Sequence, residues 1–306
     1  MGSNVVLFSS SIFMGVIISF CSSNWVMCWV GLELLTFSLI PIFYYLNKDS
    51  CAGKESIMKY FLAQSMASGI ILFSGVFLFN LGMNMFVYFF LFGVMLKLGV
   101  FPGYFWVLSV FMGLDMLSLF LLMVLSKVIP LMLITEVISV VPISLLLTLS
   151  FISMIVGAFI GLNQSKLKMM LGASSIGHGG WFLAGGITGD LWFYFFLYGF
   201  SCLIFVLTMS FNGSYLIKFL TILSISGLPP FLLFNGKVSI LSSMVNMNPL
   251  MILIPCLMAV LSMFFYLKFS YVFLVIASSS IEQPYLKFFG LLTFLLFGSL
   301  FYWFVF

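Results

Sequence analysis

The sequence predicts an all-α polytopic membrane protein, and three observations support this fold class. Of its 306 residues, 64% are hydrophobic and 6% are charged, whereas soluble domains carry about 25% charged residues. Apolar stretches of about 20 residues, the length of one helical crossing, recur from one end of the chain to the other. These stretches are continuously apolar rather than alternating, which argues against a transmembrane β-barrel.

At about 20 residues per crossing, we expect about eleven transmembrane helices. Their predicted ranges are 4–21, 25–46, 57–81, 85–112, 116–137, 139–161, 168–187, 191–211, 217–245, 249–276 and 286–306. The spans at 85–112 and 217–245 are too long for one straight helix. Each contains glycine and proline, at 99–103 and 227–230, so both are predicted to be discontinuous.

The spacing of the two discontinuous spans predicts an internal repeat. They lie five spans apart, and a repeat of five crossings returns with the opposite orientation, as in many secondary transporters. We therefore expect a single antiporter-like membrane domain over residues 1–306. It would consist of two inverted five-helix repeats, about 1–137 and 139–276, and a C-terminal helix at about 286–306. This repeat relates Glu33 to His178 and Lys97 to Lys237.

The lysines predict the orientation of the chain. All eleven basic residues are lysine, and eight of them fall on the N-terminal side of the predicted spans, while no loop on the other side contains one. Positively charged loops stay on the cytoplasmic or matrix side, so the N-terminus is expected there. The eight lysines are Lys48, Lys54, Lys59, Lys166, Lys168, Lys218, Lys268 and Lys287.

Composition argues against redox, metal and nucleotide chemistry within this chain. The five cysteines have no CxxC spacing, and the single histidine, His178, cannot supply both axial ligands of a bis-histidine haem. The glycine-rich run around His178 lacks the preceding strand and the following Lys-Ser/Thr of a phosphate-binding loop. We therefore expect no cofactor, metal or nucleic acid to bind here.

Five ionisable residues inside the predicted spans are the candidate functional groups. Each lysine or acid at a helix centre costs about 2.5–3.5 kcal/mol, so such groups need partners or water. Burial disfavours a charged lysine and a nearby carboxylate favours it, so a buried lysine can switch between the two forms. We expect a proton relay in which Glu33 pairs with Lys97. Its residues are Glu33, Lys97, Lys127, His178 and Lys237.

Structural alternatives stay open for these residues. Glu33 could form an ion pair that only fixes helix packing, and Lys97 could only satisfy the free carbonyl groups of an interrupted helix. Lys127, with Pro130 three residues later, has a similar environment. His178 lies between small residues and could only hydrogen-bond to a neighbouring helix, although its near-neutral titration would suit a relay.

Five sequence segments, taken in order, resemble the subunit 2 family of mitochondrial NADH:ubiquinone oxidoreductase, respiratory complex I. The similarity covers essentially the whole chain. It implies a proton-translocating subunit of an enzyme complex, multi-pass in the inner mitochondrial membrane, with the N-terminus in the matrix and the C-terminus in the intermembrane space. The segments are Trp29 to Glu33, Leu96 to Trp106, Gly161 to Gln164, Ser174 to Trp181 and Ser226 to Lys237.

The resemblance also implies roles for individual residues. Glu33 would be the acidic partner, Lys97 the central lysine of the first half-channel, Lys127 the connecting lysine and Lys237 the lysine toward the exit side. Flavin, iron–sulfur clusters and ubiquinone would lie in partner subunits, and the chain would not function alone. Its partners would be other membrane and peripheral subunits and inner-membrane lipids. A stand-alone proton/cation antiporter and a non-translocating assembly subunit stay open as alternatives.

Overall fold

The computed structural model describes residues 2–210, 214–229 and 231–279, and within these ranges it contains helices and no strand. The predicted span at 286–306 and Lys287 lie outside the described residues. The helices of the first part are α1 (Gly2–Cys21), α2 (Trp25–Leu46), α3 (Cys51–Gly75), α4 (Val87–Leu98), α5 (Phe105–Gly113), α6 (Met116–Met123) and α7 (Leu125–Val137). Those of the second part are α8 (Ile143–Leu162), α9 (Leu167–Thr188), α10 (Leu191–Ser210), α11 (Tyr215–Ser226), α12 (Leu232–Met247) and α13 (Leu253–Ser279).

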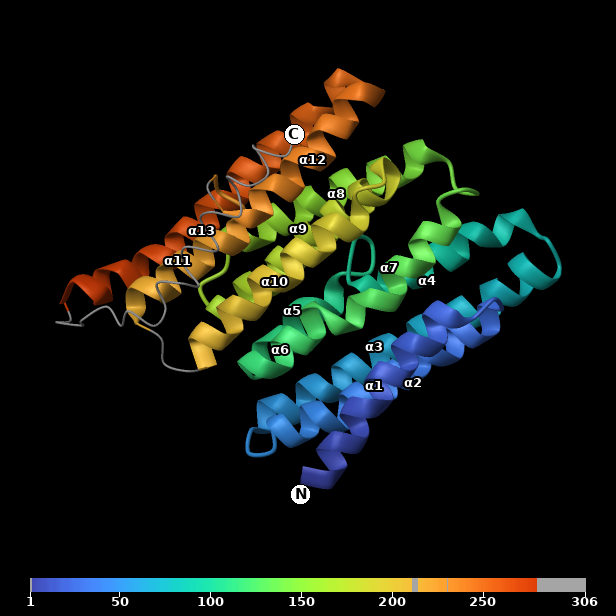
Figure 1. The fold of residues 1–306 in the computed structure, drawn as a ribbon, viewed down its shortest axis with the longest axis horizontal. Coiled ribbons are helices and arrows are strands. Elements are labelled where there is room, and N and C mark those ends of the chain that lie inside the picture. Colours follow the sequence, from blue (N-terminus) through green and yellow to red (C-terminus); the bar gives the residue numbers. More distant parts are fainter. Residues whose placement is uncertain (1, 211–213, 230, 280–306) are drawn as a thin grey trace.

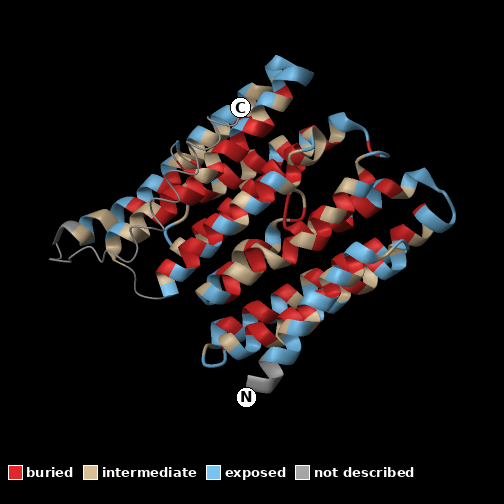
Figure 2. Ribbon diagram, in the orientation of Figure 1, coloured by how far each residue is buried: buried red, intermediate tan, exposed pale blue. Residues whose placement is uncertain are grey.

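The helices form one elongated bundle. α1, α2 and α3 lie along one flank, α11 and α13 lie along the other, and α6, α7 and α10 lie between them (Figure 1). Buried residues follow the helix faces that meet inside the bundle, whereas exposed residues cover the outer faces and the ends (Figure 2). The chemistry expected from the buried ionisable residues is therefore confined to the helix interfaces.

The outer faces of the bundle are apolar, as a lipid environment requires. Exposed side chains include Phe105, Phe196 and Met66, with 74%, 70% and 69% of their surface accessible. Within the described ranges, six helical segments are long and apolar enough to cross a membrane: Trp25–Leu46, Cys51–Asn80, Met116–Val137, Ile143–Leu162, Leu191–Ser210 and Pro249–Ala277. The predicted fold class, an all-α polytopic membrane protein, is confirmed, while the count of eleven spans stays a prediction.

Both predicted helix interruptions are present. α4 ends at Leu98 and is followed by Gly99 at φ 67°, and α11 ends at Ser226 and is followed by Gly227 at φ 69°. These left-handed conformations are ones that glycine adopts without a steric penalty. After each glycine the chain leaves the helical path for several residues before α5 or α12 begins. The backbone carbonyl groups at the ends of α4 and α11 are therefore free to accept bonds from side chains.

A third interruption was not predicted. The sequence predicted one continuous span at 116–137, but α6 ends at Met123 and α7 begins at Leu125, with Val124 at φ −110° and ψ −64° between them. Pro130, within α7, has no backbone N–H and leaves the helical bond to residue 126 unformed. At the break itself, the Lys127 N–H bonds to the Val124 carbonyl, three residues back, at 3.2 Å. This irregular turn lies directly beside Lys127.

The polar end of α3 also extends beyond its predicted span. The prediction began at residue 57, whereas α3 begins at Cys51. An exposed ion pair between Glu55 and Lys59, one turn apart, favours this extra helical length. Hydropathy located the apolar part of the helix and missed its charged first turns.

The loops that carry lysine meet at one end of the bundle, which we call the lysine-rich end. The Asp115 N–H donates to Asn47 Oδ1 at 2.7 Å, and Lys168 Nζ lies 3.8 Å from Asp115 Oδ1. Lys268 Nζ donates to the Gln164 carbonyl at 3.1 Å. Segments near residues 47, 115 and 165 therefore lie together, in agreement with the predicted charge asymmetry.

Candidate functional site

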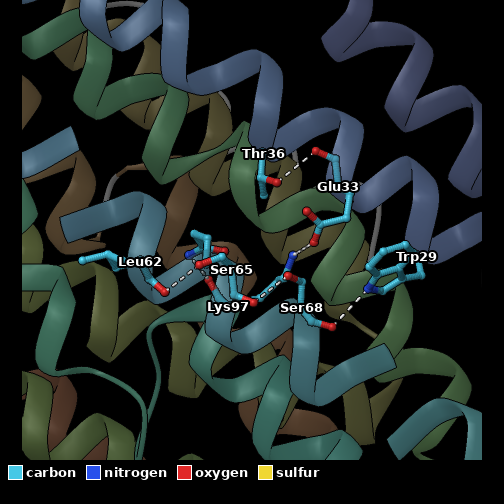
Figure 3. Close-up of polar contacts among 8 residues, drawn as sticks. Trp29, Glu33, Thr36, Leu62, Ser65, Ser68 and Lys97 are labelled. Atoms are coloured by element: carbon cyan, nitrogen blue, oxygen red, sulfur yellow. Dashed lines mark hydrogen bonds and ion pairs between the residues drawn. The ribbon is translucent and has the colours of Figure 1, made fainter. Parts of the chain in front are cut away.

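Glu33 and Lys97 form a pair in the first half of the chain. Lys97 lies in the last turn of α4, Glu33 lies in α2, and Lys97 Nζ is 3.5 Å from Glu33 Oε1 (Figure 3). The Lys97 side chain is 1% exposed and that of Glu33 is 15% exposed. The predicted contact is present. Its length is at the upper limit for a hydrogen bond, so the two groups attract each other without being tightly joined.

Other side chains satisfy the carbonyl groups where α4 ends. Gln64, from α3, donates through Nε2 to the Lys97 carbonyl at 3.3 Å, and Trp106, from α5, donates through Nε1 to the Leu96 carbonyl at 2.9 Å. The amine of Lys97 makes its contact with Glu33 instead. This geometry does not favour the alternative in which Lys97 only satisfies the interrupted helix.

Lys127 connects two helices from the middle of the chain. Its Nζ donates to the carbonyl of Ser175, in α9, at 3.0 Å, and lies 5.4 Å and 5.7 Å from the ring centres of Phe182 and Tyr198. The residue is 3% exposed. A cation is stabilised here by a neutral oxygen and two aromatic faces, without an acidic partner among the described contacts.

His178 lies between two tyrosine hydroxyl groups. Its Nδ1 is 2.7 Å from the Tyr194 hydroxyl oxygen, and its Nε2 is 3.3 Å from that of Tyr266. All three side chains are buried. Sequence reasoning did not identify the tyrosines, although a tyrosine in an otherwise apolar span is a hydroxyl group that needs a partner. Tyr194 of α10, His178 of α9 and Tyr266 of α13 thus form a chain of hydrogen bonds. Such a chain suits both a structural role and proton exchange.

Lys237 contacts the helix interruption that precedes it. From α12, its Nζ donates to the carbonyl of Ser226, the last residue of α11, at 2.6 Å, and lies 5.7 Å from the Trp181 ring centre. A Cβ atom on Gly227 would lie 3.0 Å from both Cε and Nζ of Lys237. The glycine thus allows both the left-handed turn and the close approach of the lysine.

The predicted repeat relation between Lys97 and Lys237 stays a prediction, and the two lysines lie differently beside their helix interruptions. Lys97 precedes its interruption, whereas Lys237 follows its own and reaches back to the free carbonyl. Lys237 therefore contacts the end of its interrupted helix directly, whereas the Lys97 amine contacts the Glu33 carboxylate.

A small cavity adjoins His178 and Lys237. About 20 Å³ is available to the centre of a water molecule, and Ser174, Trp181 and Tyr266 are among the residues around it. One water needs about 10–15 Å³ by this measure, together with polar partners. The cavity is large enough for one water between the histidine and the lysine.

Within the part of the chain that the structure describes, no three His, Cys, Asp or Glu side chains gather as ligands for a metal ion. The described site consists of amine, carboxylate, imidazole, hydroxyl and carbonyl groups. Amine, carboxylate and imidazole groups can bind and release protons, while the carbonyl groups accept hydrogen bonds from the lysines.

Known proteins resemble this chain in sequence and in fold. The family described as NADH:quinone oxidoreductase/Mrp antiporter, TM, matches residues 22–216. NADH-ubiquinone oxidoreductase chain 2 of Albinaria caerulea is 38% identical over 297 residues, which are 95% of this chain and 94% of that protein. Its counterpart in Anopheles gambiae is 32% identical over 292 residues, covering 87% and 84% of the two chains.

Two solved structures share the fold. A chain of respiratory complex I from Thermus thermophilus has a TM-score of 0.74 and 20% identity, over 92% of this chain and 71% of that one. A chain of the Mrp complex from Dietzia sp. has a TM-score of 0.76 and 14% identity, over 84% and 58%. At these identities the likeness concerns the fold alone.

Proposed function

The chain belongs to the NADH-ubiquinone oxidoreductase chain 2 family, and from this premise we propose that it translocates protons as a membrane subunit of respiratory complex I. The reaction to which it is coupled is electron transfer from NADH to ubiquinone. Flavin, iron–sulfur clusters and the quinone belong to partner subunits in this proposal, and the chain acts only within the assembled complex. Its location is the mitochondrial inner membrane.

The observation that carries the proposal is the set of three buried lysines, each in contact with an oxygen atom. Lys97 contacts the Glu33 carboxylate, whereas Lys127 and Lys237 contact backbone carbonyl groups. Isolated charges in a membrane interior are costly, so a purely structural subunit would gain little from three of them. We infer that Lys97, Lys127, His178 and Lys237 hold and pass protons and that Glu33 controls the charge of Lys97.

The mechanism follows from the different partners of the lysines. An ionised Glu33 offsets the cost of a buried ammonium group, so Lys97 holds its proton while the pair is close. Loss of that carboxylate, by protonation or by movement away, leaves the desolvation cost uncompensated and favours proton release. Among the described residues, Lys127 and Lys237 donate only to neutral acceptors. They can take up a proton and pass it on without first separating from a countercharge.

Purification tests this function against that of a stand-alone antiporter, which the Mrp likeness raises. We expect the chain to migrate with an assembly that carries flavin and iron–sulfur centres, and vesicles containing that assembly to take up protons when NADH is oxidised. Proton/cation exchange by the isolated chain, without that assembly, would contradict the proposal.

The proposed orientation places the lysine-rich end and the N-terminus in the matrix, and the C-terminus in the intermembrane space. Cys51, at the start of α3, is exposed and lies between the lysines of this end. A membrane-impermeant thiol reagent should therefore label Cys51 from the matrix side only. Labelling from the intermembrane space would reverse the orientation.

A further inference from the structure

Tyr60 is a buried polar residue to which the proposed relay assigns no role. It lies in α3, none of its surface is exposed, and its hydroxyl group makes no hydrogen bond to any described residue. A buried hydroxyl without a partner is unfavourable, because it has lost its hydrogen bonds to water and gained none. In native structures such groups are rare, and each calls for an explanation such as a strained, catalytic or water-binding site.

The ring of Tyr60 is held in a defined position. It packs edge to face against Phe43 of α2, with ring centres 5.5 Å apart, and against Trp106 of α5, with ring centres 5.8 Å apart. Trp106 in turn donates to the Leu96 carbonyl, next to Lys97. Contacts with α2 and α5 therefore fix the position of the Tyr60 hydroxyl group.

Tyr60 belongs to a polar face of α3 that leads to the pair. Ser56, Tyr60 and Gln64 follow one another at intervals of four residues, so they lie on one side of the helix, about 6 Å apart along its axis. All three are buried. Ser56 donates to the Ser109 carbonyl at 3.4 Å near the lysine-rich end, and Gln64 donates to the Lys97 carbonyl at 3.3 Å.

The middle position of this face lies one turn from the residue that bonds to Lys97. Gln64 donates to the Lys97 carbonyl, and the Tyr60 ring packs against Trp106, which donates to the Leu96 carbonyl. A row of polar side chains on α3 thus leads from the lysine-rich end toward Lys97. Ser56 and Gln64 have hydrogen-bond partners among the described residues, whereas the Tyr60 hydroxyl has none.

We propose that the α3 face formed by Ser56, Tyr60 and Gln64 is the branch through which protons reach the Glu33–Lys97 pair from the lysine-rich end. The Tyr60 hydroxyl binds a water molecule in this branch. The water and the Ser56 and Tyr60 hydroxyls each accept one proton, give up another and then turn back to their first orientation, so no bond is changed after a proton has passed. The Gln64 amide transfers no proton and positions the end of the path by donating to the Lys97 carbonyl. This inference rests on the proposed translocation function and adds Tyr60 to it as a proton-transferring residue.

The variant Tyr60→Phe tests the branch in the intact complex, because it removes the hydroxyl and leaves the ring in place. We expect the rate of NADH-driven proton uptake into vesicles to fall at least threefold. The ratio of the rates in H₂O and D₂O should rise, since proton delivery becomes limiting. The thermal midpoint of the assembly should change little, because the ring keeps its packing against Phe43 and Trp106. A residue with only a structural role would leave the isotope ratio unchanged.

The control for the chemical change is Tyr44→Phe, because Tyr44 is 52% exposed on α2 and lies outside the polar face. It should behave as the parent does. Lys97→Met, measured in parallel, distinguishes a failure of the proposed branch from a failure of the proposed translocation function. Parent-like rates and isotope ratio in Tyr60→Phe, with translocation lost in Lys97→Met, would overturn the branch and leave the translocation function standing. Parent-like translocation in both variants would overturn the function as well.

Discussion

The two interrupted helices use the same backbone conformation but place different electrostatic partners beside it. Gly99 and Gly227 have φ values of 67° and 69°, and each ends a helix whose last carbonyl groups accept bonds from side chains. In the first half the lysine contacts a carboxylate, and in the second half it contacts a carbonyl. The interruption therefore creates the site, while the neighbouring helix determines how firmly the lysine holds its charge.

The largest effect that this comparison predicts is that of Lys237→Met. Methionine keeps much of the apolar stem and removes the titrating amine, so proton uptake should fall more than tenfold and NADH oxidation coupled to it should fall too. Lys237→Gln retains an N–H donor for the Ser226 carbonyl but cannot titrate. An equal fall in proton uptake in this variant would show that the titrating amine, and not the hydrogen bond, is needed. Both are measured in vesicles after the assembly has been shown to be intact.

Lys218→Met is the matched control. Lys218 lies in the first turn of α11 near the lysine-rich end, where its Nζ is 5.1 Å from the Tyr215 ring centre. Its loss should change proton uptake little. Normal uptake in Lys237→Met together with reduced uptake in Lys218→Met would place the relay at the membrane surface and not in its interior.

A smaller effect is expected for Glu33→Gln. The amide keeps the shape of the side chain but removes the countercharge of Lys97, so the ammonium form loses its electrostatic compensation. Proton uptake should fall about three- to tenfold, less than in Lys237→Met because the amine of Lys97 is still present. Equal rates in Glu33→Gln and the parent, with assembly intact, would mean that the first half does not depend on its carboxylate.

The smallest effect concerns the two glycines, and it compares the two halves directly. Alanine at either position must adopt a left-handed conformation, which costs about 1–2 kcal/mol. A Cβ at 99 would collide with Val107 of α5, whereas a Cβ at 227 would lie 3.0 Å from the amine and Cε of Lys237. Gly99→Ala should therefore lower the thermal midpoint more, and Gly227→Ala should lower proton uptake more.

Gly189→Ala serves as the reference for both glycine variants. Gly189 has φ 91°, and a Cβ there meets nothing within 4 Å. Gly189→Ala therefore measures the cost of the left-handed backbone conformation without a steric clash. If all three variants lose the same stability and keep full activity, the glycines of the interruptions are needed only for their conformation.

The sequence was most informative where a single residue determines local structure. Both interruptions could be located from Gly99, Gly227 and the prolines that follow them. The energetic cost of burying a charge identified Glu33 and Lys97 as partners. The break at Val124 was missed, because neither Val124 nor its neighbours Met123 and Leu125 is a glycine or proline that would signal an interruption. Hydropathy treats such a segment as uniformly helical.

Hydrogen-bond partners that come from distant helices could not be predicted from the sequence either. Tyr194 and Tyr266 reach His178 from α10 and α13, and the carbonyl acceptors of Lys127 and Lys237 are backbone atoms that every residue carries. No residue type signals such an acceptor. Only the packing of the helices selects one carbonyl among many, so the roles of these groups stay predictions until the variants are measured.

The contact between Lys127 and Ser175 joins α7 to α9, and so connects the first predicted repeat to the second. Hydrogen bonds from a charged donor are roughly twice as strong as those between neutral groups. In the proposed relay, a Lys127 amine that has given up its proton would hold α9 less firmly than the ammonium group does. Proton transfer through Lys127 would then loosen the contact between the two predicted repeats, so that transfer of charge and relative movement of the repeats would depend on the same atom.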